Sequence, residues 1–223
     1  MKHTLYNPPS VTVDTVIFTI EDGELKVLLI KRSDPPFKGA WALPGGFLLR
    51  NEPSERGALR ILKEKAGVKN VYIEQLYTFD GVGRDPRGHV LTVAYFALAL
   101  REKISFEGNG ELQTPAFYPV KKLPALAFDH KNIISYAIKR LQAKLEYTNV
   151  VFSLLPKYFT LNQLQKAYEI ILDKKIDKRN FRKKFLSLGL MRSTKRMLSG
   201  TPQRPARLYQ FTTTKPTELK KFF

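Results

Sequence analysis

Residues 45–68 read GGFLLRNEPSERGALRILKEKAGV, with a glycine pair at the start and a glycine near the end. Apolar residues recur at helical spacing between them, which predicts a helix from about Pro53 to Ala66. Proline is tolerated in the first turn of a helix. Positions three and four residues apart share one face of a helix, so Ile61, Glu64 and Lys65 lie together. The other face, predicted to pack into the domain, carries Leu59, Leu62 and Ala66.

Segments with β-strand character flank this stretch on both sides. Strands are expected over residues 11–20, 25–32, 41–47, 71–79 and 89–100, with a short one in AFYPVKKLP. The sequence EDGE at 21–24 is typical of a hairpin turn. A second helix is predicted over 129–146 from its apolar spacing. Strands with two interspersed helices predict an α/β domain over residues 1–147.

The chain changes character in residues 148–223. A helix is predicted over 159–172 with Thr160 as its N-cap, and another over 178–188 with Asp177 as its N-cap and Gly189 at its end. The segments LMRSTKRM and RPARLYQF outline a β-hairpin. Helix, turn, helix and hairpin is the order of a winged helix-turn-helix domain.

The formal net charge of +18 is concentrated in that second part. Residues 1–147 hold 21 Lys and Arg against 16 Asp and Glu, a balance of +5, whereas residues 148–223 hold 17 against 4, a balance of +13. A basic segment with regular apolar spacing favours a polyanionic partner, although solvated surface lysines are an alternative.

The helix expected at 178–188 separates into two faces. Phe181, Phe185 and Leu188 form a narrow stripe assigned to the core, so the cations opposite point outward. An exposed helix in this position enters the major groove of double-stranded DNA, and the hairpin contacts the backbone as a wing. An ordinary solvated basic face is the alternative. The predicted DNA-contacting residues are Lys178, Arg179, Asn180, Arg182, Lys183, Lys184, Lys195, Arg196, Arg204 and Arg207.

Composition excludes several kinds of chemistry. Without cysteine the chain has no disulfide, thiolate zinc site or cysteine nucleophile. Three histidines are too few to suggest a histidine-based metal site. No window approaches the roughly 18 apolar residues of a membrane span. We expect a cytoplasmic protein without a membrane partner.

Residues 46–68 resemble the Nudix box, G-x5-E-x7-R-E-U-x-E-E-x-G-U, where U is a bulky aliphatic residue. Ile61 and Lys65 stand where the family has glutamates. The resemblance, which rests on a long pattern with rigid spacing, implies a Nudix-like α/β/α sandwich. The matching positions, seven of the nine specified, are Gly46, Glu52, Arg60, Leu62, Glu64, Gly67 and Val68.

The resemblance also says which chemistry to expect. Nudix enzymes split nucleoside diphosphate derivatives with Mg²⁺ or Mn²⁺ held by the box glutamates. Here the helical face carries one acid, Glu64, beside Lys65, a salt-bridge candidate and a poor metal site. Glu52 and Arg60, a structural pair in the family, are both present. We therefore expect no catalytic residue, no required cofactor and no metal site, unless Glu64 retains one.

Almost the whole chain resembles the Nudix-related transcriptional regulators of the NrtR type, in which a Nudix-like domain precedes a winged helix. Matching stretches include LKVLLIKR, PFKGAWALPGGF, EQLYTFDGVGRDPRGHVLTVAYFAL, LPALAFDH and DKRNFRKK. The best-known members control NAD biosynthesis genes and sense ADP-ribose, and others control pentose use. The resemblance implies a homodimeric repressor of NAD or sugar metabolism genes, which binds operator DNA and responds to ADP-ribose, a related nucleotide or a pentose.

The same resemblance suggests the residues of the ligand pocket. Arginine forks suit a diphosphate, glycines allow close approach and an aromatic ring can stack on a base. Trp41 could equally be a core residue, Asp85 and Pro86 could simply form a turn, and His130 is expected to be structural or capping. The residues carried over are Lys31, Arg32, Trp41, Gly45, Gly46, Arg84, Asp85 and Arg87.

Three hypotheses follow from these observations. The leading one is a repressor whose ligand favours a dimer geometry that no longer matches the operator half-sites. The second is a metal-dependent hydrolase of ADP-ribose or another nucleoside diphosphate derivative, with Mg²⁺ as cofactor and a basic tail that aids dimerisation or substrate capture. The third is a Nudix hydrolase that acts on RNA ends.

Overall fold

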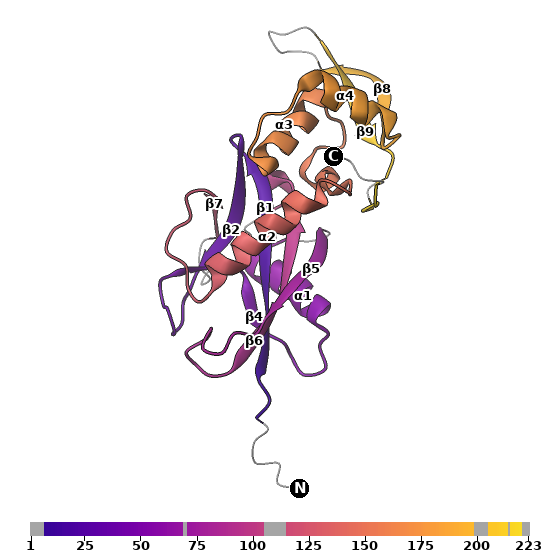
Figure 1. Ribbon diagram of the computed structural model, residues 1–223. Helices are drawn as coiled ribbons and strands as arrows, with labels where there is room; N and C mark the ends of the chain where they lie inside the picture. The colour runs from indigo at the N-terminus through magenta and orange to yellow at the C-terminus, as the bar shows by residue number, and fades with distance from the viewer. Residues whose placement is uncertain (1–6, 69–70, 105–114, 199–204, 214, 220–223) are drawn as a thin grey trace. The chain divides into compact units, whose positions relative to one another are not determined.

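The structure is a computed structural model that describes residues 7–68, 71–104, 115–198, 205–213 and 215–219. The chain forms two compact units (Figure 1), one of Met1–Phe18 with Lys26–Ala137 and the other of Thr19–Leu25 with Ile138–Phe223. The second unit thus takes in a hairpin tip from the early part of the chain. The domain boundary at 147/148 stays a prediction.

The first unit is built on a mixed sheet. Its strands run in the order β3-β2-β1-β6-β5, with β4 paired to β1 and β7 to β2. Strands β1 and β6 are parallel, whereas the pairs β1–β4, β2–β3, β2–β7 and β5–β6 are antiparallel. The strands are β1 (Ser10–Glu21), β2 (Glu24–Lys31), β3 (Trp41–Ala42), β4 (Gly45–Phe47), β5 (Tyr72–Phe79), β6 (Val90–Leu98) and β7 (Ala116–Pro119).

The predicted strands are present, with one correction. The single strand expected over 41–47 is two, because Leu43 and Pro44 interrupt it. Proline has no N–H to donate to a neighbouring strand, which breaks the ladder there. The expected turn after β1 is confirmed, since Asp22 and Gly23 both have positive φ, at 53° and 76°.

Two long helices accompany the sheet. Figure 1 shows α2 (His130–Lys144) in front of the strands and α1 (Ser54–Ala66) behind them. A short 3-10 helix, η1 (Arg101–Lys103), follows β6. Helix α1 ends at Gly67, whose left-handed φ of 62° lets its N–H reach the carbonyls of the last turn. The α/β fold class is confirmed.

The buried face of α1 differs from the prediction. Leu62 and Ala66 are buried as expected, but Leu59 is 41% exposed and Ile61 only 1% exposed. The buried positions of α1 are 57, 58, 61, 62 and 66, an arc that passes through Ile61 and leaves out Leu59. Ile61 packs with Val13, Ala58 and Tyr95 in an apolar cluster. The helical face on which the box pattern has its glutamates is therefore partly core, at Ile61.

The second unit has the order of elements expected of a winged helix-turn-helix domain. Thr160 caps α3 through a capping box with Gln163, and the Asp177 carboxylate accepts from the N–H of Asn180 to cap α4. Gly189, with φ at 65°, follows α4 as predicted. The elements are η2 (Val150–Leu154), α3 (Leu161–Leu172), α4 (Lys178–Ser187), β8 (Met191–Leu198) and β9 (Ala206–Phe211).

The core of this unit is aromatic. Phe181 and Phe185 of α4 are 3% and 1% exposed, and both rings pack edge-on against Tyr168 of α3. Leu188, the third residue of the predicted stripe, is half-buried at the C-cap. Burial of this stripe turns the opposite, basic side of α4 outward. Within the described ranges, no helix is both long and apolar enough to cross a membrane.

Candidate functional site

A cavity of about 280 Å³ opens in the first unit beside the glycine pair. Its lining comes from β1, β2 and the loop after it, β3, β4, the end of α1, the loop before β6 and the start of α2. The lining residues are Thr12, Asp14, Ile30, Arg32, Ser33, Asp34, Pro35, Ala42, Leu43, Gly45, Gly46, Phe47, Lys65, Arg84, Asp85, Arg87, Phe128 and His130.

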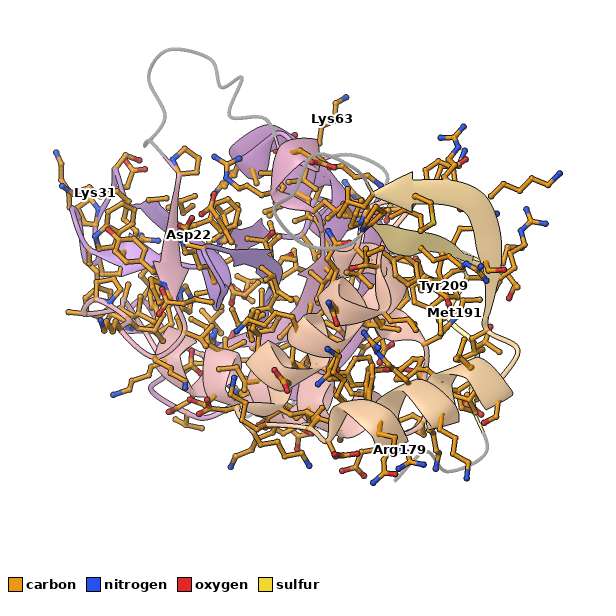
Figure 2. All side chains as sticks on the ribbon, turned by 90° about the horizontal axis from the view of Figure 1, so that it is seen from above. Asp22, Lys31, Lys63, Arg179, Met191 and Tyr209 are labelled. Atoms are coloured by element: carbon orange, nitrogen blue, oxygen red, sulfur yellow. The ribbon has the colours of Figure 1, made fainter. Side chains whose placement is uncertain are left out.

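Most of the predicted ligand residues meet at this cavity. Lys31 and Trp41 are not among its lining residues, because Lys31 points into solvent (Figure 2) and the Trp41 ring packs edge-on against Tyr118 at 4.9 Å. For Trp41 this packing favours the core alternative over base stacking. The six that line the cavity are Arg32, Gly45, Gly46, Arg84, Asp85 and Arg87.

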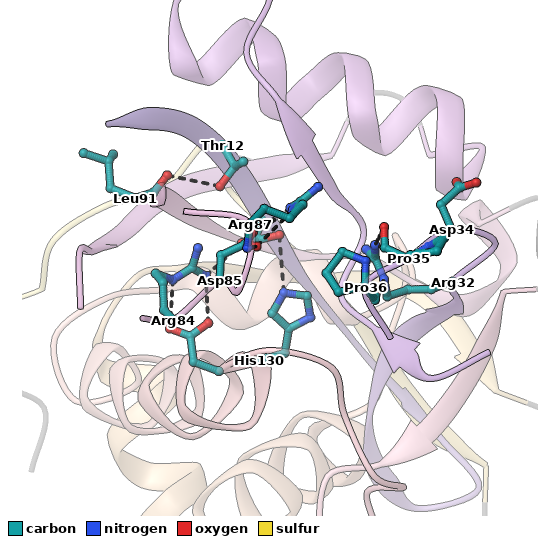
Figure 3. A network of polar contacts seen from close by, with 12 residues as sticks. Thr12, Arg32, Asp34, Pro35, Pro36, Arg84, Asp85, Arg87, Leu91 and His130 are labelled. Carbon is teal, nitrogen blue, oxygen red and sulfur yellow. Dashed lines mark hydrogen bonds and ion pairs between the residues drawn. The ribbon is translucent and has the colours of Figure 1, made fainter. Parts of the chain in front are cut away.

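A buried polar network forms the floor of the cavity (Figure 3). Arg84 Nη2 and Nε donate to the two carboxylate oxygens of Asp129 at 2.7 and 3.0 Å. Arg84 Nη2 also lies 3.5 Å from Asp14 Oδ2, and its side chain is only 5% exposed. Protein carboxylates therefore engage Nε and Nη2 of Arg84.

His130 completes this network from the start of α2. Its Nδ1 accepts from the Leu43 N–H at 2.9 Å, so the ring proton belongs on Nε2, which lies 3.6 Å from Asp14 Oδ1. Burial lowers the pKa of His130, although Asp14 opposes this. A neutral histidine that ties α2 to the main chain at Leu43 agrees with the structural role expected for it.

Arg87 is held at the wall of the cavity by Asp85. Its Nη2 and Nε donate to the Asp85 carboxylate at 2.6 and 2.9 Å, and its main-chain N–H donates at 3.0 Å, which is the turn considered for this segment. Burial opposes ionisation of Asp85, but the hydrogen bonds from Arg87 lower its pKa. The guanidinium carbon lies 5.0 Å from the ring centre of Phe47 and 5.6 Å from that of Phe128.

Arg32 faces the cavity from the end of β2. Figure 3 shows it turned toward Pro35 and Pro36, and its Nε donates to Pro36 O at 2.7 Å. Its guanidinium carbon lies 4.8 Å from the ring centre of Phe128, so Arg32 and Arg87 both contact this ring. Phe128 was not predicted as a site residue, although it precedes His130 in the FDH segment that the sequence singled out.

The glycine pair is required by close approach of neighbouring elements. In the antiparallel pair β1–β4, Asp14 lies opposite Gly45 and Val13 opposite Gly46. A Cβ on Gly45 would overlap Asp14 Oδ1 and lie 2.9 Å from Val13 O, and a Cβ on Gly46 would lie 2.8 Å from Ile61 Cδ1. A larger residue at position 45 would press on the main chain of β1, whereas one at position 46 would require the end of the Ile61 side chain to move.

The structural pair of the box is confirmed. Arg60 Nε and Nη2 donate to the two carboxylate oxygens of Glu52, each at 2.8 Å, and the Leu49 N–H donates to Glu52 Oε2 at 3.0 Å. The Arg60 hydrogen bond, followed by the one from Leu49, lowers the pKa of Glu52 to about 2. Arg60 also donates to Phe47 O at 3.2 Å, so the pair joins β4, the following loop and α1.

The expected salt bridge between Glu64 and Lys65 is replaced by two other contacts. Glu64 accepts from Arg60 Nη1 at 3.2 Å, and Lys65 Nζ donates to Gly45 O at 2.6 Å. Adjacent residues of a helix point about 100° apart, so Glu64 faces solvent while Lys65 turns to the cavity. Within the described ranges no group of three His, Cys, Asp or Glu residues is placed to hold a metal ion.

The second candidate site is the basic face of α4. Lys178, Arg179, Asn180, Lys183 and Lys184 are exposed, and Figure 2 shows Arg179 pointing away from the helix. Arg182 is half-buried and donates to Asn162 Oδ1 of α3 at 2.9 Å. The predicted separation of an aromatic face from a cationic face is confirmed for Arg179 and Lys183, whereas Arg182, predicted to point outward with them, lies half-buried against α3.

The hairpin adds further cations. Lys195, Arg196 and Arg207 are exposed on β8 and β9, and the Arg196 guanidinium carbon lies 4.5 Å from the ring centre of Tyr158. Arg204 lies outside the described residues. Arg192 of β8, which the sequence reading passed over, is exposed as well. Arg192 lies in the MRSTKR segment, and its position in a basic strand could have identified it as a candidate DNA-contacting residue.

The family models locate both sites in known domains. The NUDIX domain model matches residues 10–139, and the NrtR DNA-binding winged helix domain model matches residues 151–211. The chain belongs to the NrtR family. As in other NrtR proteins, the Nudix domain precedes the winged helix, so the recognised fold and domain order are confirmed.

Individual NrtR relatives cover most of the chain. The ADPR-responsive transcriptional repressor NtrR of Acinetobacter baylyi is 40% identical over 213 residues, 92% of this chain and 83% of the relative. Shewanella oneidensis NrtR in complex with a 27mer DNA has a TM-score of 0.81 and 38% identity, covering 91% of this chain and 93% of that one. The NUDIX domain of that NrtR in complex with ADP ribose has a TM-score of 0.55 and 40% identity, covering 63% of this chain and 94% of that one.

Proposed function

We propose that this chain is an ADP-ribose-responsive transcriptional repressor that binds double-stranded operator DNA through its winged helix. The basic face of α4 carries the proposal, because exposed cations lie opposite a buried aromatic stripe. Arginine on such a helix can address guanine edges and lysine the phosphates. The NrtR relative in complex with DNA and the ADPR-responsive repressor support this assignment.

The proposed effector site is the cavity beside the glycine pair. Arg32, Lys65 and Arg87 provide donors that suit a diphosphate, and Phe128 provides an aromatic surface. Gly45 and Gly46 permit close approach of the ligand to the main chain. The complex of the Shewanella NUDIX domain with ADP ribose supports ADP-ribose over a pentose as the effector.

The proposed mechanism is a shift between two arrangements of a homodimer. Two reading helices must match the spacing of two half-sites in a palindromic operator. ADP-ribose that binds the mismatched arrangement more tightly draws the population away from DNA. The proposed target genes belong to NAD or sugar metabolism, and the neighbouring genes on the chromosome would distinguish the two.

Fluorescence anisotropy with the protein's own promoter DNA tests the DNA-binding assignment. The double variant Arg179→Ala/Arg182→Ala should lose specific binding while its thermal melt stays that of a folded protein. Arg56→Ala/Lys63→Ala is the charge-matched control, since both residues are exposed on α1, and it should bind like the original protein. Unchanged operator affinity of the α4 variant would refute α4 as the reading helix.

We also propose that the Nudix domain does not hydrolyse its ligand and that no cofactor is required. Ile61 is core, Lys65 is a cation, and Glu64 is the box acid left on that face, with its carboxylate bound to Arg60. The second candidate, a Mg²⁺-dependent ADP-ribose hydrolase, rests on Glu64, whose side chain is 55% exposed. Incubation with ADP-ribose and Mg²⁺ should give no ribose 5-phosphate. Robust turnover that Glu64→Gln abolishes would establish the hydrolase instead.

A further inference from the structure

We propose that the Lys65 ammonium occupies the cation position of the Nudix box, so that the effector's diphosphate binds to a tethered cation and no metal ion. The inference rests on the proposed effector function and specifies how its site recognises phosphate. Of the two residues that depart from the box pattern, Ile61 and Lys65, only Lys65 lines the cavity.

The contact of Lys65 with Gly45 places the ammonium at this position. Lys65 Nζ donates to Gly45 O at 2.6 Å, and a Cβ on Gly46 would lie 3.9 Å from Nζ, so the side chain lies over the glycine pair. A main-chain carbonyl oxygen is a ligand that hard divalent cations use together with carboxylates. Here that oxygen is already bound to an ammonium.

The remaining groups do not suit a divalent ion. Ile61 is 1% exposed in an apolar cluster, and the Glu64 carboxylate points outward to Arg60. Asp14 is the nearby carboxylate in the cavity, and Arg84 and His130 lie 3.5 and 3.6 Å from its two oxygens. A metal ion would therefore meet an apolar residue and a cation at two positions where the box pattern has acids, with the engaged carboxylate of Asp14 beside them.

The charge balance of the cavity favours an anion at this point. Arg84 and Arg87 are bound to the carboxylates of Asp129 and Asp85, whereas Lys65 and Arg32 donate to neutral main-chain carbonyls. Their positive charge is therefore less compensated than that of Arg84 and Arg87. Lys65 and Arg32 both line the cavity. A diphosphate bound between them would replace its hydrogen bonds to water with charge-assisted hydrogen bonds to two cations.

Isothermal titration calorimetry with ADP-ribose, once in EDTA and once in excess Mg²⁺, tests the inference. The original protein should bind with the same Kd in both, within about twofold. Lys65→Glu, which restores the acid of the box, should weaken binding in EDTA about tenfold or more and regain affinity with Mg²⁺. Lys63→Glu is the matched control, because it makes the same charge change on the same helix and points into solvent (Figure 2), and its Kd should not change.

Other outcomes would overturn the inference. Binding by the original protein that tightens more than about tenfold with Mg²⁺ would show that a metal ion is needed. Lys65→Met, which keeps the apolar stem, should also bind ADP-ribose more weakly. An ADP-ribose Kd equal to that of the original protein would mean that Lys65 only holds Gly45 in place and does not bind the diphosphate. A thermal melt of each variant identifies one that does not fold, and Lys65→Met then carries the test in place of Lys65→Glu.

An incorrect role for Lys65 and an incorrect choice of ADP-ribose as effector give different results. If the original protein binds no ADP-ribose in either buffer, ADP-ribose is the wrong effector, and inorganic pyrophosphate replaces it as the probe. Pyrophosphate binding in EDTA that Lys65→Met abolishes and Lys63→Glu retains would still support the tethered cation. Absence of pyrophosphate binding to the original protein would refute it.

Discussion

Arg84 donates two hydrogen bonds to the carboxylate of Asp129, at 3.0 and 2.7 Å, across 45 residues of sequence. The pair joins the loop before β6 to the start of α2 at the floor of the cavity. Asp129→Asn should lower the free energy of unfolding by about 1.5–3 kcal/mol, because a buried guanidinium loses its charged acceptor. It should also weaken ADP-ribose binding, since the loop carries Asp85 and Arg87.

Chemical denaturation measures this effect. Asp80→Asn is the control, since Asp80 is an exposed acid in the same loop, and it should change stability by less than about 0.5 kcal/mol. Equal stability of the two variants would mean that the pair does not hold the loop to α2.

The pair Glu52–Arg60 should make stability depend on pH. The pKa of Glu52 is held at about 2, against 4.5 for the free side chain, first by the Arg60 hydrogen bond and then by that from Leu49. A depressed folded-state pKa stabilises the protein above the unfolded-state value, and this contribution is lost as pH falls from about 4.5 to about 2. The melting temperature should therefore be lower in Glu52→Gln at neutral pH, and the difference from the original protein should shrink over that window. A difference that stays constant down to pH 2 would contradict the pKa assignment.

Asp177 should stabilise α4 by accepting a hydrogen bond at the N-terminus of the helix, and not through its negative charge. Its side chain accepts from the Asn180 N–H at 2.8 Å. Asp177→Ala should cost about 1 kcal/mol of stability, whereas Asp177→Ser keeps an oxygen acceptor and should cost only a few tenths. Asp177→Ser also removes an acid beside the basic face, so it should bind operator DNA at least as tightly. Equal destabilisation by Ser and Ala would show that the cap is unimportant.

Lys183 should contribute a phosphate contact. Its removal in Lys183→Ala should reduce the slope of log K against log salt by about 0.9, the change expected for one phosphate neutralised. The effect should be similar on operator and unrelated DNA, because a phosphate contact carries no sequence information. Lys63→Ala on α1 should leave the slope unchanged. A slope that Lys183→Ala does not alter would place Lys183 outside the interface.

The sequence predicted local elements well where their signals are local. The cap residues Thr160 and Asp177, the stop at Gly189 and the Phe181–Phe185 stripe all depend on spacing within a few residues. The Glu52–Arg60 pair was also predicted, since the box pattern specifies both positions.

The floor of the cavity was predicted only in part, at Arg84, because its other groups come from residues far apart in the chain. Asp14 comes from a strand that reads as core, and Phe128 from a segment in which His130 was considered. The burial of Ile61 depends on how α1 rotates against β1, and a single helical wheel does not determine that rotation. For the same reason the partner of Lys65 was predicted as its neighbour Glu64, whereas the structure pairs it with Gly45.

The most direct test of the whole account is the effect of ADP-ribose on operator binding by the full chain. Fluorescence anisotropy with promoter DNA should give tight, salt-sensitive binding, and saturating ADP-ribose in EDTA should raise the Kd about tenfold or more, equivalent to a coupling of about 1.4 kcal/mol. An operator Kd that stays the same while calorimetry shows the effector site to be full would contradict the account.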